Sequence, residues 1–259
     1  MPVAALYPLV ILTALVVGGW LWRCSRRRLD LPDDQRAAIV IAAFCGAMLG
    51  AKLPFVVSDW TAVLTAGTWF ANGKTILSGL VGGYVAVEAT EWVLGVRVRT
   101  GDAFVVPVAA AIAIGRLGCF CAGCCYGTPT SLPWGMACAA TDSLARHPNQ
   151  LYEFAFHALA AGAAFLLARR RIWKGHLMKA YIIAYCAFRI ATETIRPEPV
   201  WWSGGTFYQW FAASTAIALA GVWWHAARQA GHLSSSASRS PTSSNSMSAD
   251  RSNPGGSNL

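Results

Sequence analysis

Two arginines inside apolar segments are the residues of this sequence best suited to chemistry. Arg116 lies in AIGRLG and Arg189 in YCAFRIATE, each within a run long enough to cross a membrane. A charge in hydrocarbon costs about 2.5–3.5 kcal/mol on insertion scales, so such residues are functional by default. Guanidinium groups suit bidentate contact with phosphate. The two arginines therefore predict a site for a phospholipid headgroup.

Further polar side chains share a predicted helical face with Arg189. Tyr185, Arg189, Glu193 and Arg196 follow one another at intervals of four, four and three residues, which places them on one side of a helix. One interpretation is a structural ion pair between Arg189 and Glu193. The favoured interpretation is a polar face that lines a cavity, because Arg116 enters from another segment at a similar depth.

Four cysteines follow Arg116 closely, and their chemistry is open to several interpretations. They are Cys119, Cys121, Cys124 and Cys125. Zinc sites typically use two separated pairs of ligands, so this compact spacing predicts no metal site. A disulfide, with Cys138 as one available partner, suits an oxidising outer face. The favoured interpretation is that the cysteines are small apolar residues that pack in the interior. A redox or catalytic thiol is the remaining alternative.

An irregular loop rich in glycine and proline separates the cysteines from the next apolar segment. It contains His147, which is either a base or headgroup contact or a loop histidine with neither role. The polar run that begins the next segment is expected to cap or brace it. Its members are Asn149, Gln150, Tyr152 and Glu153.

The composition indicates the elements that must position these residues. Apolar residues make up 55% of the 259 residues and charged residues only 13%, whereas a soluble domain carries about 25% charged residues. Apolar runs of about 20 residues span a bilayer as helices. The sequence thus predicts an all-α integral membrane protein with about seven transmembrane helices, at residues 4–22, 37–57, 76–96, 102–121, 150–168, 177–195 and 205–224.

The basic residues predict the orientation of these helices. They follow the first, third, fifth and seventh segments, as Arg23, Arg26, Arg27 and Arg28, then Arg97 and Arg99, then Arg169, Arg170, Arg171 and Lys174, and finally Arg228. Basic loops stay in the cytoplasm, so the N-terminus is expected outside and the C-terminus in the cytoplasm. The net charge of +9 is then topological, and no nucleic-acid partner is expected.

Two regions of different composition are expected along the chain. Residues 1–231 would form the seven-span membrane domain. Residues 232–259 are rich in serine, asparagine, glycine and proline. Such a composition cannot bury a core, so we expect a disordered cytoplasmic tail.

The motifs around Arg116 and Arg189 resemble those of the prolipoprotein diacylglyceryl transferase family. GRLGCFCAGCCYGTPTSLPWG followed by RHPNQLYE resembles the pattern G-R-x-G-N-F-x-N-x-E-x-x-G-x-P-T, then L-P-W-G, then H-P-x-Q-L-Y-E. YCAFRIATETIR and GGTFYQW resemble two further segments of the family. The resemblance covers residues 100–223 well and residues 1–99 loosely.

The resemblance implies an enzyme without a cofactor in the bacterial cytoplasmic (inner) membrane. Such enzymes transfer diacylglyceryl from phosphatidylglycerol in the lipid bilayer to the lipobox cysteine of a preprolipoprotein. The implied catalytic positions are Arg116, Arg189, Glu193, His147 and Tyr185. The implied substrate-binding positions are Arg116, Arg189, Arg196, Gly118, Gly127, Gln150 and Gln209.

Four positions depart from the family pattern. Cys119 and Ala122 stand where the pattern has asparagine, Cys124 where it has glutamate, and Leu77 where it has histidine. Either another base, His147 or Glu193, serves the reaction, or the chemistry has changed. Two functions would suit a changed chemistry: a thiol or redox protein that uses the cysteines, and a lipid-binding protein without chemistry.

Overall fold

The computed structural model describes residues 6–27, 29–58, 75–137 and 143–237. Seven long helices occupy most of these residues, and each overlaps one of the predicted apolar segments. They are α1 (Tyr7–Arg26), α2 (Asp33–Ser58), α4 (Ile76–Val93), α5 (Gly101–Cys121), α6 (Asn149–Arg169), α7 (Leu177–Thr192) and α8 (Phe207–Ala237). The last helix continues well past the predicted end at residue 224.

Four of these helices are long and apolar enough to cross a membrane. They are α1, α2, α5 and α6. The other three helices, α4, α7 and α8, are not among these candidates. Helix α7 has only 16 residues, and α4 contains Glu88 and Glu91 within its 18 residues. The chain is therefore an all-α protein with four candidate membrane-spanning helices.

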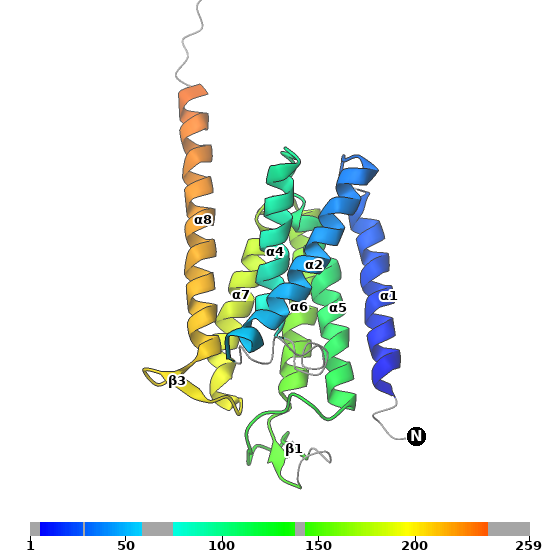
Figure 1. Cartoon of the computed structure of the whole chain (residues 1–259), viewed down its shortest axis with the longest axis vertical. Helices are drawn as coiled ribbons and strands as arrows, with labels where there is room; N and C mark the ends of the chain where they lie inside the picture. Colours follow the sequence, from blue (N-terminus) through cyan, green and yellow to red (C-terminus); the bar gives the residue numbers. More distant parts are fainter. Residues whose placement is uncertain (1–5, 28, 59–74, 138–142, 238–259) are drawn as a thin grey trace, which may run out of the picture. The chain divides into compact units, whose positions relative to one another are not determined.

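Close helix packing depends on glycine in the first half of the chain. Where α2 meets α4, a Cβ atom added to Gly82 would lie 2.4 Å from the carbonyl oxygen of Gly46. The two backbones can approach this closely only because neither residue has a side chain. Figure 1 shows α2 against α4, and α1 alongside α5, in agreement with their residue contacts.

Short strands and a single helical turn connect the helices near the end of α5. Strand β1 (Met136–Ala137) pairs antiparallel with β2 (Ala145–Arg146), and β3 (Val200–Trp202) pairs antiparallel with β4 (Gly205–Thr206). A 3₁₀ helix, η3 (Glu193–Ile195), follows α7 directly. Figure 1 shows both hairpins at the end of the bundle where α5 ends and α6 begins.

The chain divides into one compact unit that ends at Trp223 and a second unit that begins at Trp224. In the second unit Arg228 lies over the ring of Trp224, at 3.6 Å from its centroid. The predicted tail begins within α8, which includes residues 232–237. Residues 238–259 lie outside the described residues.

Candidate functional site

Glu153 is the centre of a buried cluster of charges. It lies on α6 with only 3% of its surface exposed. Its carboxylate forms an ion pair with Arg116 of α5. It also accepts hydrogen bonds from Arg189 Nη1 at 3.3 Å and from Arg196 Nη1 at 2.9 Å. The hydroxyl of Tyr185 adds a further bond at 3.3 Å. Three guanidinium groups from different segments thus meet at one carboxylate.

The end of α7 explains how Arg189 and Arg196 both reach this point. Residues four apart share a helical face, and Arg189 Nη2 donates to Glu193 Oε2 at 2.6 Å. The backbone changes to the 3₁₀ helix at Glu193, and Arg196 is extended, with φ −108° and ψ 144°. Thr206 holds the second oxygen of Glu193 through a 3.0 Å bond from its hydroxyl. The predicted polar face is therefore in direct contact with Arg116's partner, Glu153.

The cluster has spare hydrogen-bond donors. Its three guanidinium groups face the carboxylates of Glu153 and Glu193, and Arg196 Nη2 also lies 3.9 Å from Glu198 Oε1 at the edge of the cluster. In the described part of the chain, the Nε atoms of Arg116 and Arg196 are buried without a hydrogen-bond partner. Buried donors are normally satisfied. An anion that enters the cluster would provide the missing acceptors.

Aromatic rings pack around Tyr185, which contacts the cluster. Phe156 stacks on Phe188 with ring centroids 4.6 Å apart, and Tyr185 packs against both. His157, fully buried, lies 2.8 Å from the hydroxyl of Tyr181 through its Nδ1 atom. Apolar walls lower the local dielectric constant and thereby strengthen the charge interactions inside.

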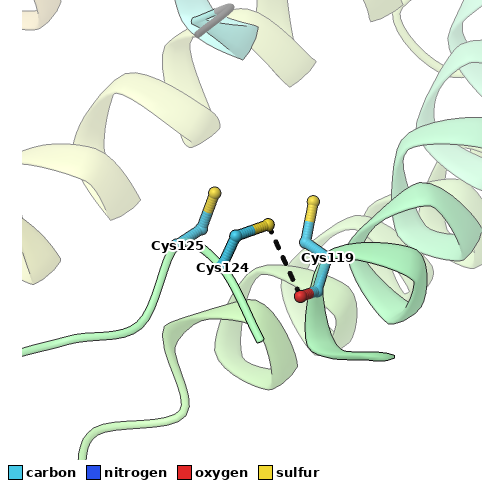
Figure 2. A group of neighbouring side chains, drawn as sticks. All are labelled: Cys119, Cys124 and Cys125. Atoms are coloured by element: carbon cyan, nitrogen blue, oxygen red, sulfur yellow. Dashed lines mark hydrogen bonds between the residues drawn. The ribbon is translucent and has the colours of Figure 1, made fainter. Parts of the chain in front are cut away.

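The end of α5 brings three cysteines together by a local backbone motif. The amide of Gly123 donates to Phe120 and that of Cys124 to Cys119, each at 3.1 Å. With Gly123 left-handed at φ +67°, these bonds form the Schellman motif that ends many helices. The sulfur atoms of Cys119, Cys124 and Cys125 consequently lie within 4.8 Å of one another, as Figure 2 shows.

The three sulfurs are free thiols beside the arginine cluster. Every described cysteine is free, and Cys138 lies outside the described residues. Arg116 Nη1 lies 4.0 Å from the sulfur of Cys119. Hydrogen bonds from Cys119 and then Cys124, reinforced by nearby guanidinium groups, lower the pKa of the Cys125 thiol. Hydrogen bonds to Cys119 and then Cys125 raise the pKa of Cys124.

Cys125 also has an unusual backbone. Its φ of +61° is left-handed, a conformation that costs a residue other than glycine about 1–3 kcal/mol. The sulfur of Cys125 nevertheless lies within 4.8 Å of those of Cys119 and Cys124 (Figure 2). The carbonyl of Cys124 is held from α6, where the side-chain amide of Gln150 donates to it.

Gly127 and Asn149 join this loop to the segment after α7. A Cβ atom on Gly127 would lie 2.6 Å from the Cβ of His147 and 2.7 Å from the carbonyl oxygen of Ile195. Asn149 donates to the same carbonyl at 3.4 Å. Gln150 and Gly127, two of the predicted substrate-binding residues, therefore hold the loop in place.

His147 lies in the loop beside the cluster and contacts a tyrosine. Its Nδ1 atom is 3.3 Å from the hydroxyl of Tyr152, which also accepts a 2.8 Å bond from Trp134 Nε1. The structure therefore places His147 with Tyr152 and Trp134, and brings the predicted arginines, Tyr185 and Glu193 together around Glu153.

The remaining two predicted substrate-binding residues are Gly118, which packs against α1, and Gln209, which stabilises a turn. Gly118 faces α1, where an added Cβ atom would lie 3.5 Å from the ring of Tyr7. Gln209 accepts a 3.1 Å bond from the amide of Thr206 and donates to the carbonyl of Ile190 at 3.4 Å. Gln209 thus stabilises the turn that presents Thr206 to Glu193.

Glu153 is the central residue that the sequence interpretation assigned only a bracing role. Gln150, Glu153 and His157 are spaced by three and four residues, and all are buried on α6. Polar residues at this spacing share one helical face, as those of α7 do. The same periodicity argument, applied to the HPNQLYEFAFH stretch, would have identified Glu153.

Comparisons with known proteins agree with the motifs. Residues 3–225 match the family model described as Prolipoprotein diacylglyceryl transferase. Similar proteins named phosphatidylglycerol–prolipoprotein diacylglyceryl transferase include one from Clostridium tetani, 29% identical over 75% of this chain and 80% of its own length. Another, from Legionella pneumophila (strain Corby), is 27% identical over 82% and 88%. A third, from Nitratidesulfovibrio vulgaris (strain DP4), is 28% identical over 82% and 84%.

Proposed function

We propose that this chain, which belongs to the prolipoprotein diacylglyceryl transferase family, transfers diacylglyceryl from phosphatidylglycerol to the lipobox cysteine thiol of a preprolipoprotein. The observation that carries the proposal is the convergence of Arg116, Arg189 and Arg196 on Glu153. The similar proteins named above provide the substrates of the proposed reaction.

The arginine cluster suits the phosphate of a lipid headgroup. A phosphodiester carries one negative charge and several acceptor oxygens, which suit a group of three guanidinium side chains. Its oxygens would accept from the unpartnered Nε atoms of Arg116 and Arg196, and Arg-phosphate contacts are strong because they are charge-assisted. The carboxylate of Glu153 holds the three guanidinium groups in place before the lipid arrives.

The same arginines would stabilise the transition state. The acceptor sulfur forms a bond to the terminal glyceryl carbon while the bond from that carbon to the phosphate oxygen breaks. The electron pair leaves with glycerol phosphate, so negative charge on the phosphate grows during the reaction. Fixed guanidinium groups, of which those of Arg116 and Arg189 are buried, lower the energy of that developing charge.

The thiol must lose its proton before or during attack, because the thiolate is the nucleophilic form. Both oxygens of Glu193 already accept bonds, from Arg189 and Thr206. His147 lies outside the arginine cluster beside Tyr152. Leu77, where the family pattern has histidine, is buried in the apolar core. Glu193 is therefore not free to accept the proton of the thiol. We assign this step to His147 or to a group beside the cysteines.

We also propose the full membrane arrangement predicted from the sequence. Seven helices would span the bacterial cytoplasmic membrane, with the N-terminus outside, the C-terminus and the tail in the cytoplasm, and residues 1–231 as the membrane domain. The four apolar helices and the contact of Tyr7 with Gly118 support this. The start of α1 then lies on the same side as Arg116, in the outer leaflet.

A transfer assay tests the proposed function. Purified protein in mild detergent would receive phosphatidylglycerol and a synthetic lipobox peptide, and mass spectrometry would detect diacylglyceryl on the peptide cysteine. We expect an adduct with the native protein and none with a peptide whose cysteine is replaced by serine. Arg189→Ala should abolish the product, since it loses contact with both carboxylates.

The matched control is Arg169→Ala, because Arg169 lies at the far end of α6 and contacts the exposed ring of Phe165. It should transfer at the native rate. Folded protein that binds phosphatidylglycerol yet forms no adduct would reject the transferase and favour a lipid-binding role.

A further inference from the structure

We propose that Cys119, Cys124 and Cys125 form a zinc site with one open coordination position, and that the acceptor's thiol binds there. The second half of this proposal rests on the proposed transferase function. The proposal gives a ligand to a cluster in which Cys119 and Cys124 depart from the family pattern. It also explains how the thiol of the acceptor becomes a thiolate.

The geometry of the three sulfurs fits a single metal ion. Zinc binds thiolate sulfur at about 2.3 Å, so three sulfurs around one ion lie about 4 Å apart. The sulfurs of Cys119, Cys124 and Cys125 are already within 4.8 Å of one another. Small side-chain rotations would therefore suffice. Figure 2 shows the three sulfurs near one another, with that of Cys124 drawn between the other two.

The backbone holds this arrangement at a measurable cost. The Schellman motif at Gly123 folds Cys124 back onto Cys119, and Cys125 adopts a left-handed conformation that its side chain disfavours. Such strain persists where surrounding structure requires it, and it concentrates at functional sites. Gln150 fixes the carbonyl of Cys124 from α6. Cysteines that merely filled space would not need this support.

The ligand set favours zinc with an exchangeable fourth ligand. Three protein ligands plus a water or substrate is the arrangement of catalytic zinc sites, whereas structural sites have four protein ligands. Copper(I), which thiolates also select, is satisfied by three sulfurs and would leave no position for a substrate. Cys125 is exposed, so a fourth ligand can reach the ion from solvent.

The position of the site connects it to the headgroup. Arg116 lies 4.0 Å from the sulfur of Cys119 and also pairs with Glu153. Its guanidinium group would lie beside the negative charge of a zinc ion with three thiolates, a favourable contact in addition to its pair with Glu153. A thiol bound to the ion would then lie beside the site proposed for the lipid phosphate.

Zinc would supply the thiolate by coordination. The acceptor thiol displaces water from the fourth position and releases its proton to solvent, because a coordinating thiol is deprotonated outright. The sulfur then forms its bond to the glyceryl carbon, and the electron pair of the broken carbon–oxygen bond leaves with glycerol phosphate. No oxidation or reduction occurs, and the ion regains water when the thioether departs.

Metal content tests the site without requiring activity. The reduced full-length protein, equilibrated with zinc and washed free of unbound metal, should contain about one zinc ion per chain. Even the loss of a residue that only supports a metal ligand costs 10–100-fold in affinity, so Cys119→Ser, Cys124→Ser and Cys125→Ser should each lower affinity roughly tenfold or more. Cys121→Ser, in the same motif but outside the cluster, is the matched control and should retain the metal.

Cobalt in place of zinc tests the open position. The native protein should show thiolate-to-cobalt charge-transfer absorption, and the lipobox peptide should change that spectrum while its serine analogue does not. Absence of bound metal in the reduced protein, or equal loss in Cys121→Ser, would overturn the site. An unchanged spectrum with the peptide would overturn its role in binding the acceptor. Failure of the transferase itself would appear separately, as bound metal without a lipid adduct.

Discussion

Glu153 binds three guanidinium groups at once and is therefore the residue on which the site depends. It joins α5, α6 and the segment after α7 through Arg116, Arg189 and Arg196. Burial makes its charge costly, and the three positive partners compensate that cost. When one partner of such a network is removed, the remaining charges lose their compensation. The network is thus sensitive to Glu153 more than to any single arginine.

Glu153→Gln should lower the free energy of unfolding by about 3–5 kcal/mol, the cost of breaking a buried ion pair. The reason is that three guanidinium groups would then lose the carboxylate they share, and Arg116 would lose its ion-pair partner. Thermal unfolding in detergent measures the loss. Phosphatidylglycerol should recover part of it, because its phosphate replaces the missing negative charge.

The control for this change is Asp33→Asn. The side chain of Asp33 is 92% exposed and pairs with Arg36 at 2.5 Å, and such a surface pair contributes about 0–1 kcal/mol. An equal loss in both variants, or no recovery of Glu153→Gln with phosphatidylglycerol, would contradict the anion-binding role of the cluster.

Arg189→Lys should reduce kcat/KM by about a hundredfold, the effect of losing one group that stabilises a developing oxyanion. Arg189 contacts Glu153 through Nη1 and Glu193 through Nη2. A lysine has a single ammonium group and cannot hold both carboxylates in that fork geometry. The transfer assay with phosphatidylglycerol and the lipobox peptide measures the change.

Arg169→Lys serves as the comparison, since Arg169 lies over the ring of Phe165 at the far end of α6 from the arginine cluster. Its kcat/KM should stay within twofold or so of the native value, as for most surface changes. Native activity in Arg189→Lys would show that charge alone, without bidentate geometry, is sufficient.

At the level of the elements, the loop after α5 must lie close to the start of α6. The amide of Gly127 donates to the carbonyl of His147 at 2.8 Å, and that of Thr128 donates to Ile195 at 2.9 Å. These bonds hold the cysteine segment against the arginine cluster. The absence of a side chain at Gly127 is what allows this approach.

Gly127→Ala should destabilise the protein by about 1–3 kcal/mol, the usual cost of adding an atom to a filled site. The new Cβ atom would lie 2.6 Å from the Cβ of His147 and 2.7 Å from the Ile195 carbonyl oxygen. Gly162→Ala is the matched control within α6, where an added Cβ meets nothing within 4 Å.

The control should be neutral or slightly stabilising, because alanine is favoured over glycine by about 0.5–1 kcal/mol inside a helix. Differential unfolding temperatures of the two variants measure the contrast. If Gly127→Ala unfolds at the native temperature, the loop can move away from α6 without loss.

The sequence allowed the helices to be located, because apolar runs of sufficient length have few competing structures. It also allowed the shared face of Tyr185, Arg189 and Glu193 to be identified from helical spacing. It did not indicate that Arg196 turns back after a 3₁₀ helix, since that depends on the local backbone. Nor did it show the convergence of the cysteines, because the spacing rule considered pairs and not the Schellman motif at Gly123.

At the level of the whole molecule, the basic connections lie together and away from the site. The α4–α5 and α6–α7 connections meet where Arg99 Nη1 lies 3.2 Å from His176 Nε2. Asp102 accepts from the amide of Leu177 at 2.8 Å in the same place. The opposite end of α5 has Arg116 and the cysteines. The gathering of the basic connections at one end is what the positive-inside rule would produce in a membrane.

The native cysteines test this orientation without any engineered site. Cys24 lies in the last turns of α1 and is exposed, as is Cys125 beyond the end of α5. A charged maleimide does not cross the bilayer. In spheroplasts treated with a chelator, it should modify Cys125 at once and Cys24 only after permeabilisation. Peptide mass spectrometry identifies each labelled residue, with Cys125→Ser as the assignment control. Labelling of Cys24 before permeabilisation, with Cys125 protected until then, would place the site on the cytoplasmic face, where an exported preprolipoprotein would reach it before translocation.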